Sequence, residues 1–437
     1  FLLMKNWTFK KWNNILGWAV FGIALVTYLS TIEHKFSFWD TGEYISSAVK
    51  LEVTHAPGAA LFQLVGAVAA ILSFGNEAYY SLIINAMSAL FSAFTILFLF
   101  WTITHLVRRI LNKEMEELSS AEMISVLFSG VIGSLAFTFS DTFWYSAVEG
   151  EVYSMASMFI ALVVWLITKW ENEYHDSDSQ RWIILIFFIT GLSVGVHMMV
   201  MLAVPAVCFI YYARNYKFTW KNFIIANFIT LGVLAFVFKG IFPIVMRLFG
   251  KSEIFFVNSI GLPFHSGTII AFVILVAFCY YIIRYTRKTK NHLYQTIALS
   301  VVYMIIGFSC WMMIPIRANA NPPMNLNNPD TAIGMLDYYN REQYGDWPTI
   351  YGQNYTAHLD AHGIERNEDS GYKTIKTGDV YEKNEKTGKY DKVDERTSYV
   401  YNKDHVSFLP RMYNSDRTVM NNYVSMYGAP DFEYNYS

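Results

Sequence analysis

The segment LIINAMSALFSAFTILFLFWTITHLV, residues 82–107, decides the fold class. It holds no Asp, Glu, Lys or Arg, and Arg108 and Arg109 follow it directly. A helix needs about 20 apolar residues to cross a hydrocarbon core of about 30 Å. The segment therefore predicts a membrane-spanning helix that ends at a charged surface.

Eight further apolar runs have the length of a membrane span or come close to it. They lie near residues 14–30, 122–139, 153–170, 182–197, 199–213, 222–239, 268–285 and 295–314. The 437-residue chain is 54% hydrophobic and 16% charged, whereas soluble domains carry about 25% charged residues. Together these features predict an all-α polytopic membrane protein with nine spans.

The basic residues predict its orientation, because cytoplasmic loops carry an excess of Lys and Arg. Lys5, Lys10 and Lys11 put the N-terminus in the cytoplasm. A tenth apolar stretch, 57–74, would turn the later basic loops outward if it crossed. We therefore expect it to lie along the outer surface, within one long external loop, 31–81.

The composition changes sharply after Arg317, where Asn, Asp, Tyr, Lys and Gly become frequent. We predict a transmembrane domain, 1–317, and an external segment, 318–437, of mixed or irregular structure, in which 365–405 forms either short strands and hairpins or a mobile loop. No small-residue cleavage site follows the first apolar run, which we interpret as an anchor and not a signal peptide. The abrupt start and end of the chain predict that it is incomplete.

Charge and cysteine content exclude several functions. The net charge is −2, which gives no indication of a nucleic-acid partner. The three cysteines lie inside apolar runs, where they resemble small buried hydrophobic residues and not a disulfide framework or a metal site.

The first external loop carries two acids, Asp40 and Glu43, three residues apart. On a helical turn they share one face. Desolvation beside Phe38, Trp39 and Tyr44 would raise the basicity of a carboxylate, which suits a general base. The alternative is a solvated loop in which the two acids form a capping box.

Two histidines lie at the same predicted membrane face. His55 opens the surface helix and could bind an anion at its N-terminus, or it could be an interfacial residue without a role. His197 occupies an external turn between two spans, where an ionisable residue is expensive unless it has a partner. The alternative for His197 is a structural role, in which its ring forms a hydrogen bond with a backbone carbonyl.

Three further residues complete the candidate set. Glu149 and Glu151 flank Gly150 in the second external loop and could clamp a divalent cation, or they are ordinary surface acids. Arg317 follows the last span and could hold a phosphate through two hydrogen bonds. It could equally be an anchor for lipid headgroups.

Several blocks of the sequence resemble a bacterial family similar to eukaryotic transmembrane protein 260, a protein O-mannosyltransferase. The blocks are FWDTGEYISSAVKLEVTHAPGAALFQLVG (38–66), TFWYSAVEGEVYSM (142–155), GLSVGVHMMV (191–200), IPIRANANPPMNLNNPDT (314–331) and YYNREQYGDWP (338–348). The resemblance covers about residues 10–350. It implies a C-type glycosyltransferase (GT-C) fold, in which a helical bundle takes sugar from a polyprenyl-phosphate carrier on the periplasmic or lumenal side.

The resemblance also implies roles for individual residues. Asp40 matches the general base, with Glu43 beside it, and Glu151 matches a second acid. Arg317 matches the arginine that holds the lipid phosphate, and His55 and His197 lie in matching blocks. Enzymes of this fold that use lipid diphosphates need a metal such as Mg or Mn, whereas those that use monophosphates generally do not.

We therefore expect an inverting glycosyltransferase of the bacterial inner membrane that modifies Ser or Thr hydroxyls of exported proteins. Its N-terminus would be cytoplasmic and its C-terminal segment periplasmic. The alternatives are a transporter or flippase for a lipid-linked or anionic solute and a non-catalytic subunit of a secretion system. Transporters place their sites near the midplane, often in two related halves, whereas here the ionisable residues gather at one predicted surface and no repeat is visible.

Overall fold

The computed structural model describes residues 8–175, 178–345, 348, 350–369, 371–410 and 416–434. Lys5, which contributes to the predicted orientation, lies outside the described residues. The chain divides into two compact units. We call Phe1–Ser252 with Thr268–Tyr338 the helical unit, and Glu253–Gly267 with Tyr339–Ser437 the C-terminal unit.

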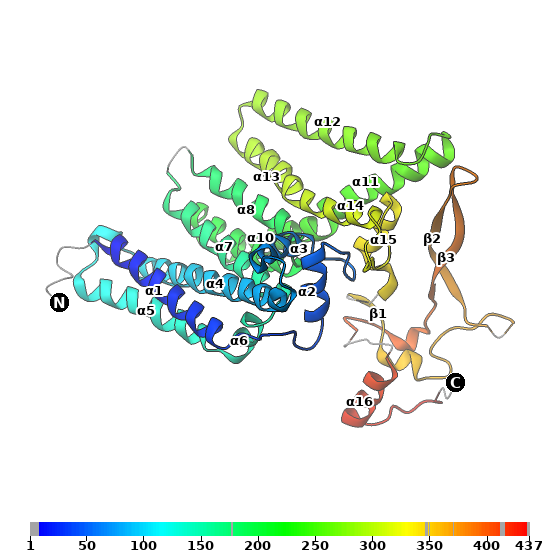
Figure 1. Cartoon of the computed structure of the whole chain (residues 1–437), viewed down its shortest axis with the longest axis horizontal. Helices are drawn as coiled ribbons and strands as arrows, with labels where there is room; N and C mark the ends of the chain where they lie inside the picture. The colour runs from blue at the N-terminus through cyan, green and yellow to red at the C-terminus, as the bar shows by residue number, and fades with distance from the viewer. Residues whose placement is uncertain are drawn as a thin grey trace. The chain divides into compact units, whose positions relative to one another are not determined.

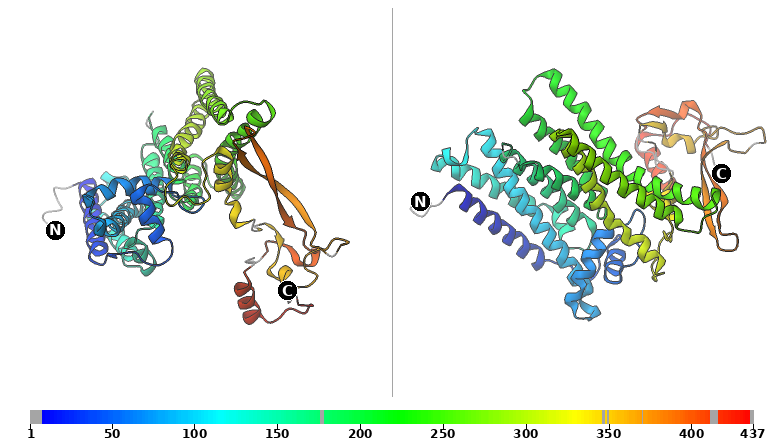
Figure 2. Two further views of the ribbon diagram at one scale, coloured as in Figure 1. Left: turned by 45° about the vertical axis from the view of Figure 1, so that its right-hand side comes forward. Right: turned by 90° about the horizontal axis from the view of Figure 1, so that it is seen from above.

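The helical unit is a bundle built around a long central helix, α4. The helices α1, α5 and α7 pack against α4, α8 packs against α7, and α13 packs against α8 (Figures 1 and 2). The first helices of the unit are α1 (Phe9–Ser30), α2 (Thr41–Lys50), α3 (Ala60–Ala70), α4 (Tyr80–Ile110), α5 (Ser120–Thr138), α6 (Asp141–Ala147), α7 (Val152–Asn172) and α8 (Gln180–Ser193). Those that follow are α9 (Val204–Asn215), α10 (Trp220–Ala235), α11 (Phe242–Ile254), α12 (Ser266–Thr289), α13 (His292–Phe308), α14 (Met313–Asn319) and α15 (Ala332–Asn340).

The predicted polytopic helical architecture is confirmed. Among the described residues, eight helices are long and apolar enough to cross a membrane. One of the nine predicted spans, 182–197, is not among these eight. It corresponds to α8, whose 14 residues are fewer than the roughly 20 that a perpendicular crossing needs. The stretch 57–74 forms α3 and a short 3-10 helix, Ile71–Ser73, which together make a second apolar helical segment shorter than the eight.

The apolar exterior of the bundle fits a membrane environment. In α12 only 11% of the most apolar window is buried inside the protein. Large side chains such as Phe272, Val273 and Val276 are exposed along it. A contiguous exposed apolar surface of this kind faces lipid or another protein.

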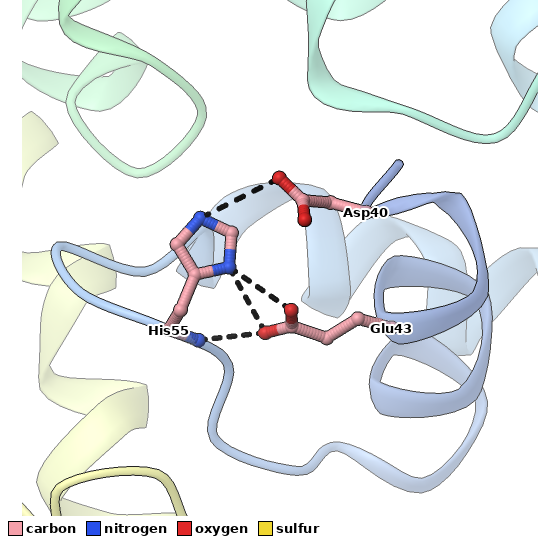
Figure 3. Close-up of side chains that lie close together, drawn as sticks. All are labelled: Asp40, Glu43 and His55. Carbon is pink, nitrogen blue, oxygen red and sulfur yellow. Dashed lines mark hydrogen bonds and ion pairs between the residues drawn. The ribbon is translucent and has the colours of Figure 1, made fainter. Parts of the chain in front are cut away.

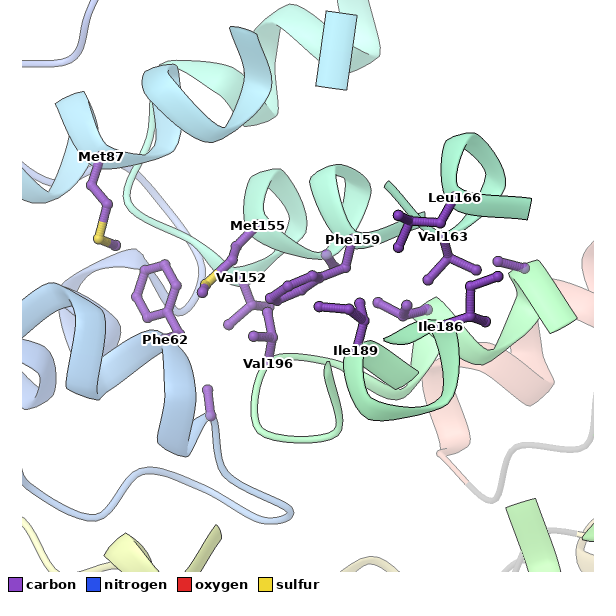
Figure 4. Close-up of a cluster of buried hydrophobic side chains, with 14 of the residues drawn as sticks. Phe62, Met87, Val152, Met155, Phe159, Val163, Leu166, Ile186, Ile189 and Val196 are labelled. Atoms are coloured by element: carbon purple, nitrogen blue, oxygen red, sulfur yellow. The ribbon is translucent and has the colours of Figure 1, made fainter. Parts of the chain in front are cut away.

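The core nearest the first loop joins α2 and α3 to α4, α7 and α8. Phe62 packs there with Met87, Met155 and Phe159 (Figure 4). Tyr44 of α2 belongs to the same cluster. Because α2 and α3 are held by this buried cluster, the first loop has a fixed place on the bundle.

Two glycines allow α8 and α13 to touch along their backbones. A Cβ atom added at Gly191 would lie 2.0 Å from the carbonyl oxygen of Met304, and one at Gly307 would lie 2.3 Å from that of Phe188. Small residues at a crossing let membrane helices approach closely. These two positions therefore tie the short helix α8 into the bundle.

The long helical segment from Trp220 to Ser259 is interrupted by two π-helical stretches, Phe236–Ile241 and Phe255–Ser259. Pro243 follows the first of them. Proline cannot donate a backbone hydrogen bond, and its ring crowds the preceding turn. Pro243 therefore explains why the helix widens to a π-helical turn directly before it.

The C-terminal unit contains two small antiparallel sheets. The strands β2 (Thr374–Asn384) and β3 (Lys389–Tyr399) form a long hairpin, and β1 (Tyr351–Gln353) pairs with β4 (Val406–Phe408). The helix α16 (Arg417–Tyr427) follows. The predicted mixed structure with hairpins in this part of the chain is confirmed.

The division between the units differs from the predicted boundary at residue 317. Residues 318–338 stay with the helical unit, because Val53 bridges Asn325 and the Tyr338 hydroxyl donates to the carbonyl of Thr54. The segment Glu253–Gly267 joins the C-terminal unit, where Tyr390 donates a hydrogen bond to Glu253.

Candidate functional site

The first helix of the loop between α1 and α4, α2, places two acids beside a histidine. Glu43 accepts hydrogen bonds from the backbone N–H of His55 at 2.7 Å and from its Nδ1 at 3.0 Å (Figure 3). The other ring nitrogen, Nε2, lies 3.9 Å from a carboxylate oxygen of Asp40. We call Asp40, Glu43 and His55 the acid–histidine cluster. The imidazole ring thus stands between two carboxylates.

The capping-box alternative is not formed. Asp40 occupies the N-cap position of α2, but its side chain makes no capping hydrogen bond. The Glu43 carboxylate turns to His55 and not back to the helix start. The two acids therefore share one helical face, as the spacing predicts, and that face presents them to the histidine.

The predicted desolvation of Asp40 is wrong in this structure. Its side chain is 53% exposed, against 21% for Glu43. The neighbouring aromatic residues Phe38 and Trp39 are themselves exposed, so they shield it little. Asp40 is instead the open side of the cluster, where an incoming hydroxyl group could reach it.

Burial opposes ionisation of Glu43, but the His55 contacts outweigh it. Desolvation raises the pKa of this carboxyl, and the hydrogen bonds from the side chain and backbone of His55, together with its charge, lower the pKa below its ordinary value. Glu43 is therefore ionised at neutral pH and orients the imidazole.

The loop between α6 and α7 brings two buried acids to the same place. Glu149 is 4% exposed and Glu151 is 8% exposed. Ser37 donates a hydrogen bond to Glu149. A Cβ atom at Gly150 would lie 2.8 Å from Oδ1 of Asn85, so only glycine fits between the two acids without displacing α4.

The charges of the two loops interact. Burial, followed by the negative charges of Glu149 and Asp40, raises the pKa of Glu151 to about 7, and the charge of His55 opposes this rise. Burial likewise raises the pKa of Glu149, against the hydrogen bond from Ser37. Glu151 can therefore change its protonation state near neutral pH in the immediate field of the cluster.

Two tyrosines line the same region, and sequence reasoning gave neither a role in the site. The Tyr44 ring centroid lies 5.8 Å from that of His55. Tyr153 lies within electrostatic reach of Glu151 and Asp40. The position of Tyr44 directly after Glu43 and that of Tyr153 two residues after Glu151 are the signals in the sequence that could have identified them.

His197 reaches this region through Tyr153. It is the N-cap of the 3-10 helix Met198–Ala203, and its Nδ1 accepts a hydrogen bond from the Met199 backbone at 3.1 Å. Its ring centroid lies 5.5 Å from that of Tyr153. The alternative predicted for His197 is a hydrogen bond to a backbone carbonyl. In the structure its Nδ1 instead accepts a hydrogen bond from a backbone N–H.

Arg317 is not brought to the acids. Its Nε donates to the carbonyl of Leu51 at 2.5 Å and its Nη2 to that of Lys50 at 3.3 Å. These carbonyls end α2, whereas Asp40 begins it. Ten helical residues span about 15 Å, so Arg317 holds the far end of α2 in place.

The segment between α2 and α3 is fastened by distant residues. The Tyr338 hydroxyl donates to the carbonyls of Thr54 at 2.5 Å and His55 at 3.2 Å. Gln63 donates to the carbonyl of Glu52 at 2.9 Å. These contacts fix the backbone that carries His55, and no spacing rule in the sequence predicts the Tyr338 contact.

The acid–histidine cluster is also suited to a cation. Each of its three residues offers one ligand atom, and these atoms lie within 4.8 Å of one another. It is the one such group of three found among the described residues. The predicted cation ligands Glu149 and Glu151 are not part of that group, and their assignment stays a prediction.

The described residues define a polytopic helical membrane protein in which acids, histidines and tyrosines gather where the first loop meets the start of α7. Residues 40–220 match the model of the protein O-mannosyl-transferase TMEM260 N-terminal domain, which confirms the predicted family resemblance over this region. Residues 345–435 match a second family, of unknown function (DUF8416).

Two curated relatives agree with the first match. Protein O-mannosyl-transferase TMEM260 of Mus musculus is 28% identical over 176 residues, which is 40% of this chain and 22% of the relative. Protein O-mannosyl-transferase tmem260 of Dictyostelium discoideum is 23% identical over 214 residues, 47% of this chain and 24% of the relative. The chain thus spans less than a quarter of the length of the relatives it matches. No solved structure matches it.

Proposed function

We propose that this chain is a membrane glycosyltransferase that moves a sugar from a polyprenyl-phosphate carrier to Ser or Thr hydroxyls of exported proteins. The observation that carries the proposal is the acid–histidine cluster beside Glu151. All of these residues lie within the region that matches a family named for protein O-mannosyl transfer.

The proposed reaction is an inverting displacement. Asp40, the open acid, accepts the proton of the acceptor hydroxyl while the hydroxyl oxygen attacks the anomeric carbon. The bond from that carbon to the phosphate oxygen breaks, and the lipid phosphate leaves with the electron pair. The sugar is thereby transferred with its anomeric configuration inverted.

The histidines fit the charge that develops on the leaving phosphate. Glu43 orients His55 and stabilises its protonated form, so the ring can present positive charge to an anion. We assign His197 to the same donor-binding region through its contact with Tyr153. Protonated Glu151 can donate a hydrogen bond to a phosphate oxygen. Arg317 acts on the reaction through α2, as a positioning residue.

The nature of the carrier phosphate decides whether a cation takes part. Asp40, Glu43 and His55 would hold a Mg or Mn ion, which would neutralise a diphosphate leaving group when bound. Chelation with EDTA separates the cases, because loss of transfer that added Mn restores assigns a diphosphate donor. Unchanged transfer after chelation assigns a monophosphate donor.

The proposed location follows from the charge distribution. The basic residues at the end of α4 favour a cytoplasmic position for that end. Those at the end of α12 favour the same side when α8, packed against α7 and α13, also crosses the membrane. The acid–histidine cluster then faces the periplasm of a bacterial inner membrane, where exported acceptor proteins and lipid-linked sugars meet. The C-terminal unit would share that compartment and help to position the acceptor.

The test compares Asp40→Asn with a matched control, Asp141→Asn. Asp141 is an exposed acid at the start of α6, in the second external loop. Transfer to a Ser/Thr-containing acceptor is measured with purified protein in liposomes that contain lipid-linked sugar. We expect Asp40→Asn to lower the rate by at least about 10²-fold, with unchanged thermal stability, and Asp141→Asn to retain the wild-type rate.

Glycoproteomics of a deletion strain provides the independent readout. Loss of glycans from exported proteins, restored by the wild-type chain and not by Asp40→Asn, would support the enzyme. Normal transfer by Asp40→Asn would remove the base assignment. Unchanged glycans in both the deletion and the Asp40→Asn strain would overturn the proposed function.

A further inference from the structure

A polar cavity lies at the end of the bundle away from the candidate site. Its volume is about 120 Å³, and residues of α1, α4 and α7 line it, among them Asn14, Trp101, Arg108, Trp165 and Lys169. On α4, Asn85 packs against the loop of Glu149 and Glu151, and the first cavity residue, Trp101, follows sixteen positions later. At 1.5 Å per residue, the two sites are about 24 Å apart along the helix.

The acids beside this cavity already have cationic partners. Glu171 contacts His105 at 2.7 Å and Arg109 at 2.8 Å. Glu114 contacts Arg108 at 3.0 Å. Arg108, which is 1% exposed, also donates to Oδ1 of Asn172 at 2.7 Å. The buried guanidinium is thus fixed as part of the wall.

Lys169 remains as a cation that faces the cavity without a matching acid. In the described part of the chain its ammonium group contacts no carboxylate, and it lies 5.0 Å from the centroid of the Trp165 ring. The nearby Glu173 is engaged by Arg181 at 2.8 Å and by Trp182 Nε1 at 2.7 Å. Glu173 nevertheless attracts Lys169 at longer range, and Lys10 adds a second positive charge to the field of Lys169. The cavity therefore carries an excess of positive charge.

Its other walls suit a lipid headgroup. Trp101 and Trp165 stack with their ring centroids 5.3 Å apart, and both line the cavity. Tryptophan is enriched where membrane meets water, and basic pockets between membrane helices bind anionic headgroups. The amide of Asn14 and the hydroxyl of Thr168 offer further polar contacts.

We propose that this cavity binds the phosphate of an anionic phospholipid, with Lys169 as its ion-pair partner. The phosphodiester takes the place of the missing acid, and the acyl chains run along the apolar exterior of α1, where Ile15, Trp18 and Val26 are exposed. The bound headgroup ties together three helices of the bundle at the end away from the acid–histidine cluster. The site is distinct from the proposed donor site, and the proposal does not depend on glycosyl transfer.

The experiment uses the full chain, purified in detergent and stripped of lipid. Phosphatidylglycerol, phosphatidylcholine and inorganic phosphate are titrated separately, with thermal stability and native mass spectrometry as readouts. We expect phosphatidylglycerol to raise the melting temperature and to remain bound, because a ligand that prefers the folded state stabilises it. Phosphatidylcholine and inorganic phosphate should do neither at the same concentration.

The variants assign the effect to Lys169. Lys169→Gln should weaken phosphatidylglycerol binding by about tenfold or more, the effect of losing roughly 1.4 kcal/mol. Lys169→Arg should retain binding. The matched control is Lys113→Gln, because Lys113 pairs with Glu122 at 2.7 Å and does not line the cavity. It should bind as the wild type does.

A second variant keeps the test decisive if Lys169→Gln fails to fold. Asn14 lies exposed at the rim, so Asn14→Asp adds negative charge there without changing the core. It should also weaken phosphatidylglycerol binding. Undiminished binding by both variants, equal binding of phosphatidylcholine, or equal stabilisation by inorganic phosphate would each overturn the proposal.

Discussion

At the scale of single residues, Glu151 is the acid of the site whose surroundings most disfavour its ionised form. It is 8% exposed and lies in the field of Glu149 and Asp40. The raised pKa of about 7 in the folded protein, against an ordinary value of 4.5, means that the folded state prefers the protonated acid. Its contribution to stability is full below pH 4.5 and is lost as the pH rises through about 7.

We therefore predict that Glu151→Gln stabilises the protein in a pH-dependent way. The neutral amide removes the destabilising charge, so the gain in unfolding free energy should be near zero at pH 4.5 and on the order of 1–3 kcal/mol at pH 8. Thermal unfolding of wild type and variant across this range measures it. The exposed Glu116 supplies the control, since Glu116→Gln should show no such trend. A gain that is constant with pH would contradict the assignment.

The individual site residues were predictable from the sequence to different degrees. The spacing of Asp40 and Glu43 predicts a shared helical face, and the structure shows that face turned to His55. Exposure could not be predicted, because it depends on how α2 packs against the bundle. For the same reason the desolvation expected at Asp40 is found at Glu149 and Glu151.

At the scale of elements, Arg317 controls the end of α2. Its two hydrogen bonds reach backbone carbonyls that a helix terminus leaves unpaired. An ammonium group cannot reproduce the fixed fork of a guanidinium. Replacing Arg317 with Lys should therefore lose the stabilisation of α2. If Arg317 bound a phosphate instead, the positive charge of Lys would retain part of the binding.

We predict that Arg317→Lys and Arg317→Gln lower thermal stability alike, by roughly 1–3 kcal/mol, the usual effect of losing charged hydrogen bonds. Both should lower the transfer rate without a selective rise in the KM for the lipid-linked donor. A normal KM in Arg317→Lys together with a raised KM in Arg317→Gln would show that the charge binds the donor directly.

The contact between α8 and α13 gives a second prediction at this scale. Gly191→Ala and Gly307→Ala each place a methyl group into backbone atoms of the partner helix. Overpacking of this kind costs about 1–3 kcal/mol, so both variants should melt earlier than the wild type. Gly232→Ala in α10 is the control, because a Cβ there meets nothing within 4 Å. Equal melting temperatures for all three would mean that the two helices lie further apart.

Helices were more predictable than their boundaries. Long runs without charge identified every long helix, because the bilayer sets a minimum apolar length. The same rule overestimated 182–197, where α8 ends at Ser193 and a turn follows. The π-helical stretches in 220–259 extend that segment well beyond the predicted 222–239, since hydropathy alone does not record where a wide turn lets a helix continue.

At the scale of the whole molecule, the orientation of the helical unit can be tested directly. Reporter fusions after Asn112, beyond α4, and after Lys290, beyond α12, should both report the cytoplasm. A fusion after Gly75, between α3 and α4, should report the opposite side. An external signal at Asn112 would place the acid–histidine cluster on the cytoplasmic face and exclude a periplasmic reaction.

The long-range contacts were the part that the sequence could not predict. Tyr338 and Thr54 are separated by 284 positions, and Tyr390 and Glu253 by 137. No local period or spacing rule connects such residues. They decide which segments belong to each compact unit, so the unit boundary could not be placed from composition alone.

The Tyr338 hydroxyl has a consequence for the order of events during synthesis. The carbonyls of Thr54 and His55 enter the membrane early, but their partner is made 284 residues after Thr54. At about 5–20 residues per second, the ribosome needs roughly 15 to 60 seconds to reach it. A nascent chain that stops before Tyr338 would hold its helices in the bilayer with the backbone around His55 still unfastened.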